Sequence, residues 1–187
     1  PEALRAAGYA TGMVGKWHLG DVSPSLPNDL GFDDYFGVLH SNDMAPLPLY
    51  RNREVADPHP IDQRFLTPRY TDEAIAWIER HAEAPFFLHF AHNFPHIPLH
   101  ATPGQAGRSD AGVYGDVVAD LDASVGRIVD ALERLGIEDE TLLILTSDNG
   151  PWFQGSAGRV RGRKNEVFEG GMRVPFIASW PGRIGPR

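Results

Sequence analysis

The 187-residue chain contains no cysteine, which excludes disulfide bonds, zinc–thiolate sites and a cysteine nucleophile among these residues. It also lacks an apolar run of the roughly 20 residues that a membrane-spanning helix needs. Basic residues are in the minority, with 17 Lys and Arg against 25 Asp and Glu and a formal net charge of −8. We therefore expect neither nucleic-acid binding nor a membrane span.

The residues that are present predict a globular protein with many turns. A hydrophobic content of 42% can form a substantial core, and 20 Gly with 16 Pro favour frequent loops. The clearest helix is predicted at about 113–135, where apolar residues recur every three or four positions and Gly136 follows. Another helix is predicted to run to about Ala82, with Thr67 as its N-cap and Pro68 in its first position.

Short apolar runs predict strands at 10–14, 85–91, 141–146 and 174–180, and the composition of the run at 141–146 predicts burial on both faces. Helices come before strands repeatedly along the chain. That order predicts an α/β fold with a largely parallel central sheet flanked by helices. The segment 21–63 is rich in Pro and Asp and has little periodicity, so a long loop region is expected there.

Polar side chains follow three of the predicted strands. The pairs are Lys16 with His18, His92 with His96, and Asp148 with Asn149, and a basic segment occupies 161–164. Each feature alone has an ordinary explanation, such as a solvated surface residue or a common turn. Because sites in open α/β sheets form beyond the carboxyl ends of strands, the set together predicts an anionic substrate held beside a metal.

Four segments resemble motifs of the sulfatase family, the arylsulfatase-like branch of the alkaline phosphatase superfamily, and they occur in the family's order. They are GKWHLG at 15–20, PHIP at 95–98, SDNGP at 147–151, and Lys164 followed by FEGGMRVP at 168–175. The resemblance implies the alkaline phosphatase-like N-terminal domain of a sulfatase. Residues 1–187 would then be the central part of that catalytic domain, incomplete at both ends, with the nucleophile segment and the C-terminal subdomain missing.

The resemblance implies a sulfuric ester hydrolase that cleaves aryl or carbohydrate sulfate monoesters with a formylglycine nucleophile. By the same resemblance, Lys16 and Lys164 would bind the sulfate oxygens and stabilise developing charge. His96 would bind sulfate and protonate the leaving oxygen, and His18 would act as a base. Ser41 would be a further polar substrate contact, although a loop serine ordinarily makes a turn.

The family also implies a divalent metal, Ca²⁺ with Mg²⁺ as the alternative, bound by Asp148 and Asn149. Its partners would be a small-molecule or glycan sulfate ester and a formylglycine-generating or anaerobic sulfatase-maturing enzyme. Family habit favours the periplasm, the extracellular space or a lysosome-like compartment. His89 is interpreted as a structural histidine, and the resemblance assigns no role to His92 or His100.

No (C/S)xPxR nucleophile motif occurs in the chain, so we expect these residues alone to be inactive. Three other interpretations stay open: a phosphate or phosphonate ester hydrolase of the same superfamily, a non-catalytic relative that binds sulfated glycans, and an α/β domain without an active site. The polar segment 43–63 is expected to line the approach to the site. Tyr50, Arg51 and Arg53 would be its substrate contacts.

Overall fold

The computed structural model describes residues 1–185 and divides into two compact units, Pro1–Ala131 and Leu132–Arg187. The boundary falls in the last turns of α3 (Gly112–Leu135). No helix in the described part of the chain is long and apolar enough to cross a membrane.

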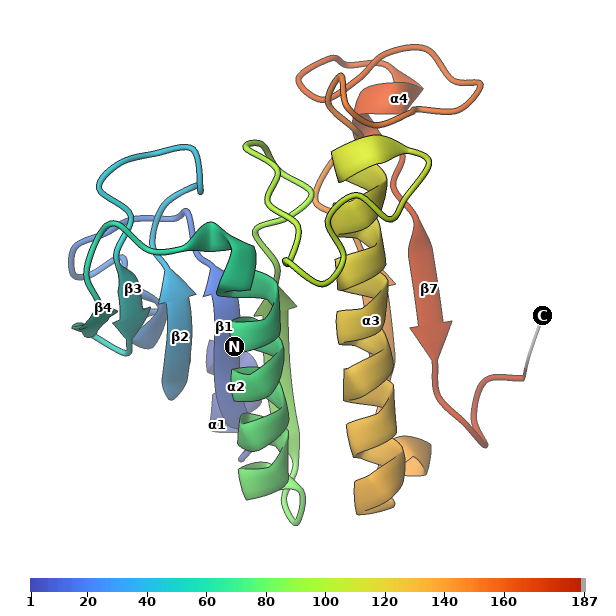
Figure 1. Cartoon of the computed structure of the whole chain (residues 1–187). Helices are drawn as coiled ribbons and strands as arrows, with labels where there is room; N and C mark the ends of the chain where they lie inside the picture. The colour runs from blue at the N-terminus through green and yellow to red at the C-terminus, as the bar shows by residue number, and fades with distance from the viewer. Residues whose placement is uncertain (186–187) are drawn as a thin grey trace. The chain divides into compact units, whose positions relative to one another are not determined.

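Unit 1 is built on a five-stranded sheet with the strand order β4-β3-β2-β1-β5 (Figure 1). The strands are β1 (Ala10–Lys16), β2 (Asp34–Val38), β3 (Leu49–Arg51), β4 (Glu54–Asp57) and β5 (Phe86–Ala91). β1 pairs in parallel with both β2 and β5, whereas β3 is antiparallel to β2 and to β4. The α/β prediction is therefore confirmed, with a mixed sheet that has a parallel centre.

The segment 21–63 is not the long loop region that the sequence predicted, because it contains β2, β3 and β4. β2 is only five residues long and begins at Asp34, directly after Asp33, so its apolar signal is brief. The two residues between β3 and β4 include Asn52, whose φ is 54°, and this left-handed residue permits the tight hairpin. The prediction failed because composition was given more weight than a short apolar run.

Both faces of the central strands are covered. On one face lies α2 (Leu66–His81), whose Trp77 ring sits directly over Gly12 and donates a hydrogen bond to Asp34 at 2.9 Å. On the other face Met13 and Tyr35 pack with Phe32 from the loop that joins β1 to β2. The centre of this small sheet is thus shielded from water, which agrees with its apolar parallel strands.

The predicted helices occur, with a change at one start. α3 spans Gly112–Leu135, as its apolar spacing indicates. α2 begins at Leu66, so Thr67 lies inside the helix and is not its N-cap. A short 3-10 helix, η2 (Gln63–Phe65), leads directly into α2, and Asp62 caps that turn by accepting a hydrogen bond from the Arg64 amide. Helical geometry therefore begins before the Thr-Pro signal.

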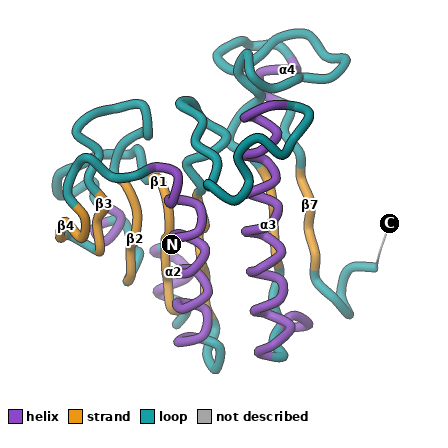
Figure 2. Tube along the Cα trace, in the orientation of Figure 1, coloured by secondary structure: helices purple, strands orange, loops and turns teal. Residues whose placement is uncertain are grey.

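Unit 2 contains a two-stranded antiparallel sheet formed by β6 (Leu143–Thr146) and β7 (Phe176–Ser179). A 3-10 turn, η3 (Glu138–Glu140), precedes β6, and α4 (Glu169–Met172) precedes β7. The burial predicted for both faces of the strand at 141–146 is not found, because Ile144 and Leu145 are 48% and 42% exposed in the structure. A long loop connects β6 to α4, and Figure 2 shows the part of it around α4.

Candidate active site

The carboxyl ends of the three parallel strands lie at the same edge of the unit 1 sheet, where their following loops gather (Figure 1). Lys16 is the last residue of β1 and pairs with Val38, the last residue of β2. Close approach of the strands requires Gly15, since a Cβ there would lie 1.8 Å from the Ala91 carbonyl oxygen. The pairing continues beyond β1, as the His18 amide donates to the Leu39 carbonyl at 3.0 Å.

His18 has an unusual backbone and an electropositive surrounding. Its φ of 60° is left-handed, which is uncommon for a residue other than glycine and is typical of functional sites. Desolvation lowers the pKa of His18, and the charges of Lys16, His40 and His96 lower it further. The Asp43 carboxylate opposes this shift. His18 is therefore held in its neutral form near pH 7, when it can accept a proton.

His96 belongs to the loop after β5, and its ring orientation is fixed from one side. Its Nδ1 lies 2.6 Å from the Ile97 carbonyl oxygen, which can only accept a hydrogen bond. Nδ1 therefore carries the proton in the neutral ring. That tautomer leaves Nε2 as the atom that can exchange a proton with a ligand. The Ser41 hydroxyl oxygen is 3.5 Å from the same Nδ1.

The structure brings together Lys16, His18, Ser41 and His96, the four unit 1 residues that the sequence predicted for the site. It adds Asn42, which sequence reasoning missed, and Asp43, which the sequence placed only within the segment 43–63 expected to line the approach. Asn42 is 2% exposed, and the Ser41 hydroxyl lowers the pKa of the Asp43 carboxyl. A usable signal existed, since a polar run begins at His40 directly after an apolar one, but β2 was not recognised as a strand.

His92, which follows β5 as closely as His96 does, does not belong to this cluster. The Thr71 hydroxyl donates its proton to the Thr67 carbonyl at 2.7 Å, so the hydroxyl oxygen of Thr71 can only accept from Ser124, at 2.6 Å. The Ser124 oxygen in turn accepts a hydrogen bond from His92 Nε2 at 3.2 Å. Nδ1 of His92 has no hydrogen-bond partner among the described residues. Burial lowers the pKa of His92 to about 4. His92 is thus a neutral histidine that joins β5, α2 and α3.

In unit 2, backbone hydrogen bonds connect the predicted metal-binding turn to the segment that carries Lys164. The Lys164 amide donates to the Pro151 carbonyl at 3.0 Å, and the Gly150 amide donates to Gly171 at 2.9 Å. Close packing here requires glycine, as a Cβ on Gly150 would lie 1.9 Å from the Gly170 oxygen. The SDNGP, Lys164 and EGG segments therefore form one local structure.

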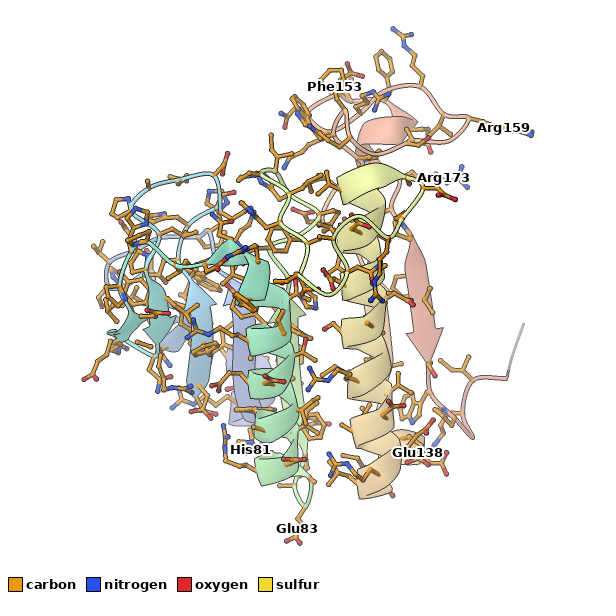
Figure 3. All side chains as sticks on the ribbon, in the orientation of Figure 1. His81, Glu83, Glu138, Phe153, Arg159 and Arg173 are labelled. Carbon is orange, nitrogen blue, oxygen red and sulfur yellow. The ribbon has the colours of Figure 1, made fainter. Side chains whose placement is uncertain are left out.

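The neighbouring arginines of unit 2 have structural contacts. Arg161 stacks on the Phe168 ring at 3.7 Å, and Arg163 donates hydrogen bonds to the carbonyls of Trp152 and Gly155. Figure 3 shows Phe153 and Arg159 projecting outward from the same loop.

Asp148 and Asn149 supply a carboxylate and an amide oxygen, the hard ligands that Ca²⁺ and Mg²⁺ prefer. Asp148 is exposed at the end of β6, so its carboxylate is accessible to an ion. Among residues 1–185, however, no three His, Asp or Glu side chains are grouped as a metal centre would need. The two residues fit part of a metal shell of six to eight oxygens and do not complete one.

Arg51 and Arg53 do not lie at the site edge. Arg51 forms two hydrogen bonds to Glu73 and stacks on Phe36 at 4.7 Å, and Arg53 pairs with Asp29 at 2.7 Å. Both lie toward the amino end of β2, the end away from Lys16. The structure therefore does not place them as substrate contacts of the cluster.

The fold and this cluster define a class of protein: an α/β domain that gathers lysine and histidine side chains at the carboxyl ends of its parallel strands. The Sulfatase family model matches residues 1–187. Mouse (Mus musculus) N-acetylgalactosamine-6-sulfatase is 41% identical, over 98% of this chain and 40% of its own length. The chain belongs to the sulfatase family.

Solved structures agree with that assignment. One, described under the metabolism of multiple glycosaminoglycans by Bacteroides thetaiotaomicron, has a TM-score of 0.90 at 27% identity and covers 99% of this chain and 55% of its own. Another, Ps i-CgsB in complex with k-i-k-neocarrahexaose, has a TM-score of 0.84 at 29% identity and covers 97% of this chain and 47% of its own. The chain thus spans about half of these proteins, and 40% of the mouse relative.

Proposed function

We propose that the full-length protein containing this chain hydrolyses sulfate monoesters of carbohydrates or phenols. The observation that carries the proposal is the cluster of Lys16, His18 and His96 at the carboxyl edge of the sheet, in a chain that belongs to the sulfatase family. Cations beside proton-exchanging imidazoles suit an anionic ester whose leaving oxygen must be protonated.

The residues of this chain then have distinct tasks. Lys16 binds the sulfate oxygens and stabilises the charge that develops on them, and Lys164 is the second sulfate-binding cation. His96 acts in its doubly protonated form: it donates the proton on Nε2 to the leaving oxygen and keeps the Nδ1 proton hydrogen-bonded to the Ile97 carbonyl. Neutral His18 accepts a proton in the later step that releases sulfate. The Ser41 hydroxyl is a polar contact for the substrate.

The reaction would also need a divalent cation and a nucleophile. Asp148 and Asn149 would hold a divalent cation, Ca²⁺ or Mg²⁺, together with further ligands, and that ion would supply positive charge near the sulfate. The nucleophile would be a formylglycine in another segment of the full-length protein. A formylglycine-generating or anaerobic sulfatase-maturing enzyme would therefore be its partner before activity appears.

A carbohydrate sulfate is the favoured substrate class. The mouse relative is named for N-acetylgalactosamine 6-sulfate, and the structure of Ps i-CgsB contains an oligosaccharide. Both similarities extend over nearly the whole of this chain. N-acetylgalactosamine 6-sulfate and a simple aryl sulfate are accordingly the first substrates to test.

The test uses the full-length protein, co-expressed with a maturing enzyme and checked by mass spectrometry for the aldehyde. Sulfate release from N-acetylgalactosamine 6-sulfate and 4-nitrophenyl sulfate is measured beside phosphate release from 4-nitrophenyl phosphate. We expect multiple turnovers on a sulfate ester and a lower kcat/KM on the phosphate. A protein with verified aldehyde that cleaves the phosphate faster, or releases no sulfate, would contradict the proposal.

A further inference from the structure

Asn42 is a buried amide that spans the loop carrying His96. Its Nδ2 donates to the Pro98 carbonyl at 3.1 Å and lies 3.5 Å from the His96 carbonyl, so one side chain reaches both ends of the His-Ile-Pro turn. The side chain is 2% exposed. Two carbonyl acceptors fix the orientation of the amide, because a flipped amide would bring its oxygen against theirs.

A second amide holds Asn42 from the opposite side. Gln63, in the turn before α2, accepts from Asn42 Nδ2 at 3.3 Å and donates to the Asn42 carbonyl at 2.9 Å. The reciprocal pair connects the loop after β2 to the start of α2, whose buried first turn includes Leu66. Asn42 therefore joins the His96 turn to a rigid element.

Neighbouring contacts act on the same histidine. Ser41, the residue before Asn42, lies 3.5 Å from His96 Nδ1, and the His96 amide donates to the Asn93 carbonyl at 3.2 Å. The contacts with Asn93 and Ile97 lie within the loop itself. Asn42 connects the His96 and Pro98 carbonyls to a different part of the fold.

We propose that Asn42 is the positioning residue for His96, through its contacts with the backbone of the His96–Pro98 turn. It touches neither substrate nor reacting atoms, and its task is to aim Nε2 at the leaving oxygen of the ester. The inference rests on the proposed function, because it assumes that His96 protonates that oxygen. Displacing a general acid by about 1 Å can lower a rate by about a hundredfold.

The chain offers a matched control in Asn28. Its Nδ2 also bridges two carbonyls, of Phe32 at 3.1 Å and Asp33 at 3.2 Å, and it also contacts an amide oxygen, that of Asn52 at 3.3 Å. In both asparagines Oδ1 has no hydrogen-bond partner among the described residues. Asn28 lies at the amino end of β2 and Asn42 beyond its carboxyl end, so the same substitution removes the same bonds at opposite ends of one strand.

The experiment compares Asn42→Leu with Asn28→Leu in the full-length matured protein, on N-acetylgalactosamine 6-sulfate and 4-nitrophenyl sulfate. A sugar alkoxide needs protonation to leave, whereas nitrophenolate is a stable anion that needs it far less. We expect Asn42→Leu to lower kcat/KM about 10- to 100-fold for the sugar ester and less than about threefold for the aryl ester. Asn28→Leu should leave the ratio between the two esters unchanged.

Gln63 is half-buried, so Gln63→Leu can replace Asn42→Leu if the latter disturbs folding. Gln63→Leu should change the ratio of kcat/KM between the sugar and aryl esters in the same direction as Asn42→Leu, by a smaller factor. Equal losses on both esters, or an equal change in their ratio from Asn28→Leu, would overturn the assignment.

Hydrogen exchange measured by mass spectrometry tests the positioning role of Asn42 independently of turnover. Peptides covering 94–101 should exchange faster in Asn42→Leu than in the unsubstituted protein, and at an unchanged rate in Asn28→Leu. If the protein releases no sulfate, the proposed function fails while this exchange result still judges the role of Asn42. Unchanged exchange at 94–101 would refute the positioning role.

Discussion

The two ends of β2 hold positive charge in different ways. At the amino end each arginine faces a carboxylate: Arg5 pairs with Asp33, Arg51 with Glu73, and Arg53 with Asp29. At the carboxyl end Lys16, His40 and His96 lie close enough to His18 to lower its pKa together. The difference lies in the arrangement: ion pairs with carboxylates hold the arginines at the amino end, whereas at the carboxyl end a lysine gathers with three histidines, of which His40 contacts Asp21 at 3.2 Å.

Removing the proton donor should have the largest effect and separates the two ends most clearly. In the full-length matured protein, His96→Ala should lower kcat/KM for the sugar sulfate by about 10² to 10⁴, as expected for loss of a general acid. Arg53→Ala, at the amino end, should change it less than about twofold, because an exposed ion pair contributes little. Steady-state kinetics measures kcat/KM for both variants. Similar losses in the two would contradict the difference between the two ends of β2.

The next largest effect is expected from His92, on how the free energy of unfolding changes at acid pH. The folded protein protonates His92 near pH 4, whereas the unfolded chain does so near 6.5. Between these values the unfolded state binds more protons, so stability falls as the pH falls from 6.5 to 4, by up to about 3 kcal/mol. Urea unfolding across this range should show a weaker pH dependence for His92→Gln. An identical pH dependence in the two proteins would refute the assignment.

A substitution of Tyr70 tests how the loop after β5, which carries Asn93 and His96, is held to α2. Its hydroxyl is fully buried and donates to Asn93 Oδ1 at 2.8 Å. Tyr70→Phe leaves that oxygen without its partner and should destabilise the protein by about 1–3 kcal/mol. Denaturant unfolding measures the loss, and a variant as stable as the parent would show that Asn93 finds another partner.

The smallest effect concerns the pH dependence of activity. Desolvation and nearby positive charges hold the pKa of His18 below 6.5, so the acid limb of kcat, which includes the sulfate-releasing step, should reach its plateau before neutrality. The Asp43 charge raises this pKa, so Asp43→Asn should lower it and move the limb to lower pH by less than about one unit. A limb that moves to higher pH would contradict the sign of this coupling.

The sequence predicted elements with long or strongly apolar signals. The helix at 113–135 shows its period over six turns and appears as α3, and the run at 85–91 appears as β5. β2 was missed because its five residues begin with Asp34 and are soon followed by a polar run, so they carry little periodicity. The start of α2 was misplaced because Asp62 caps a preceding 3-10 turn, a contact that depends on loop geometry.

The site was predicted in part for a related reason. Lys16, His18 and His96 stand at strand ends that the sequence located, and the parallel pairing of β1 and β5 brings those ends together. Asn42 follows the strand that was missed, so no sequence argument placed it, and Asp43 was placed only as the first residue of the segment 43–63 expected to line the approach. His92 shows the converse: proximity to His96 in sequence did not bring it to the site, because its ring turns toward Ser124.

Binding of inorganic sulfate tests the central claim most directly. Calorimetric titration of the full-length protein with sulfate should show binding that Lys16→Met weakens by about tenfold or more, the loss expected for a charge-assisted contact. Arg53→Met, whose cation is neutralised by Asp29, should bind sulfate within about twofold of the parent. Equal weakening by the two variants, or sulfate binding that survives Lys16→Met unchanged, would contradict an anion site at the carboxyl end of the sheet.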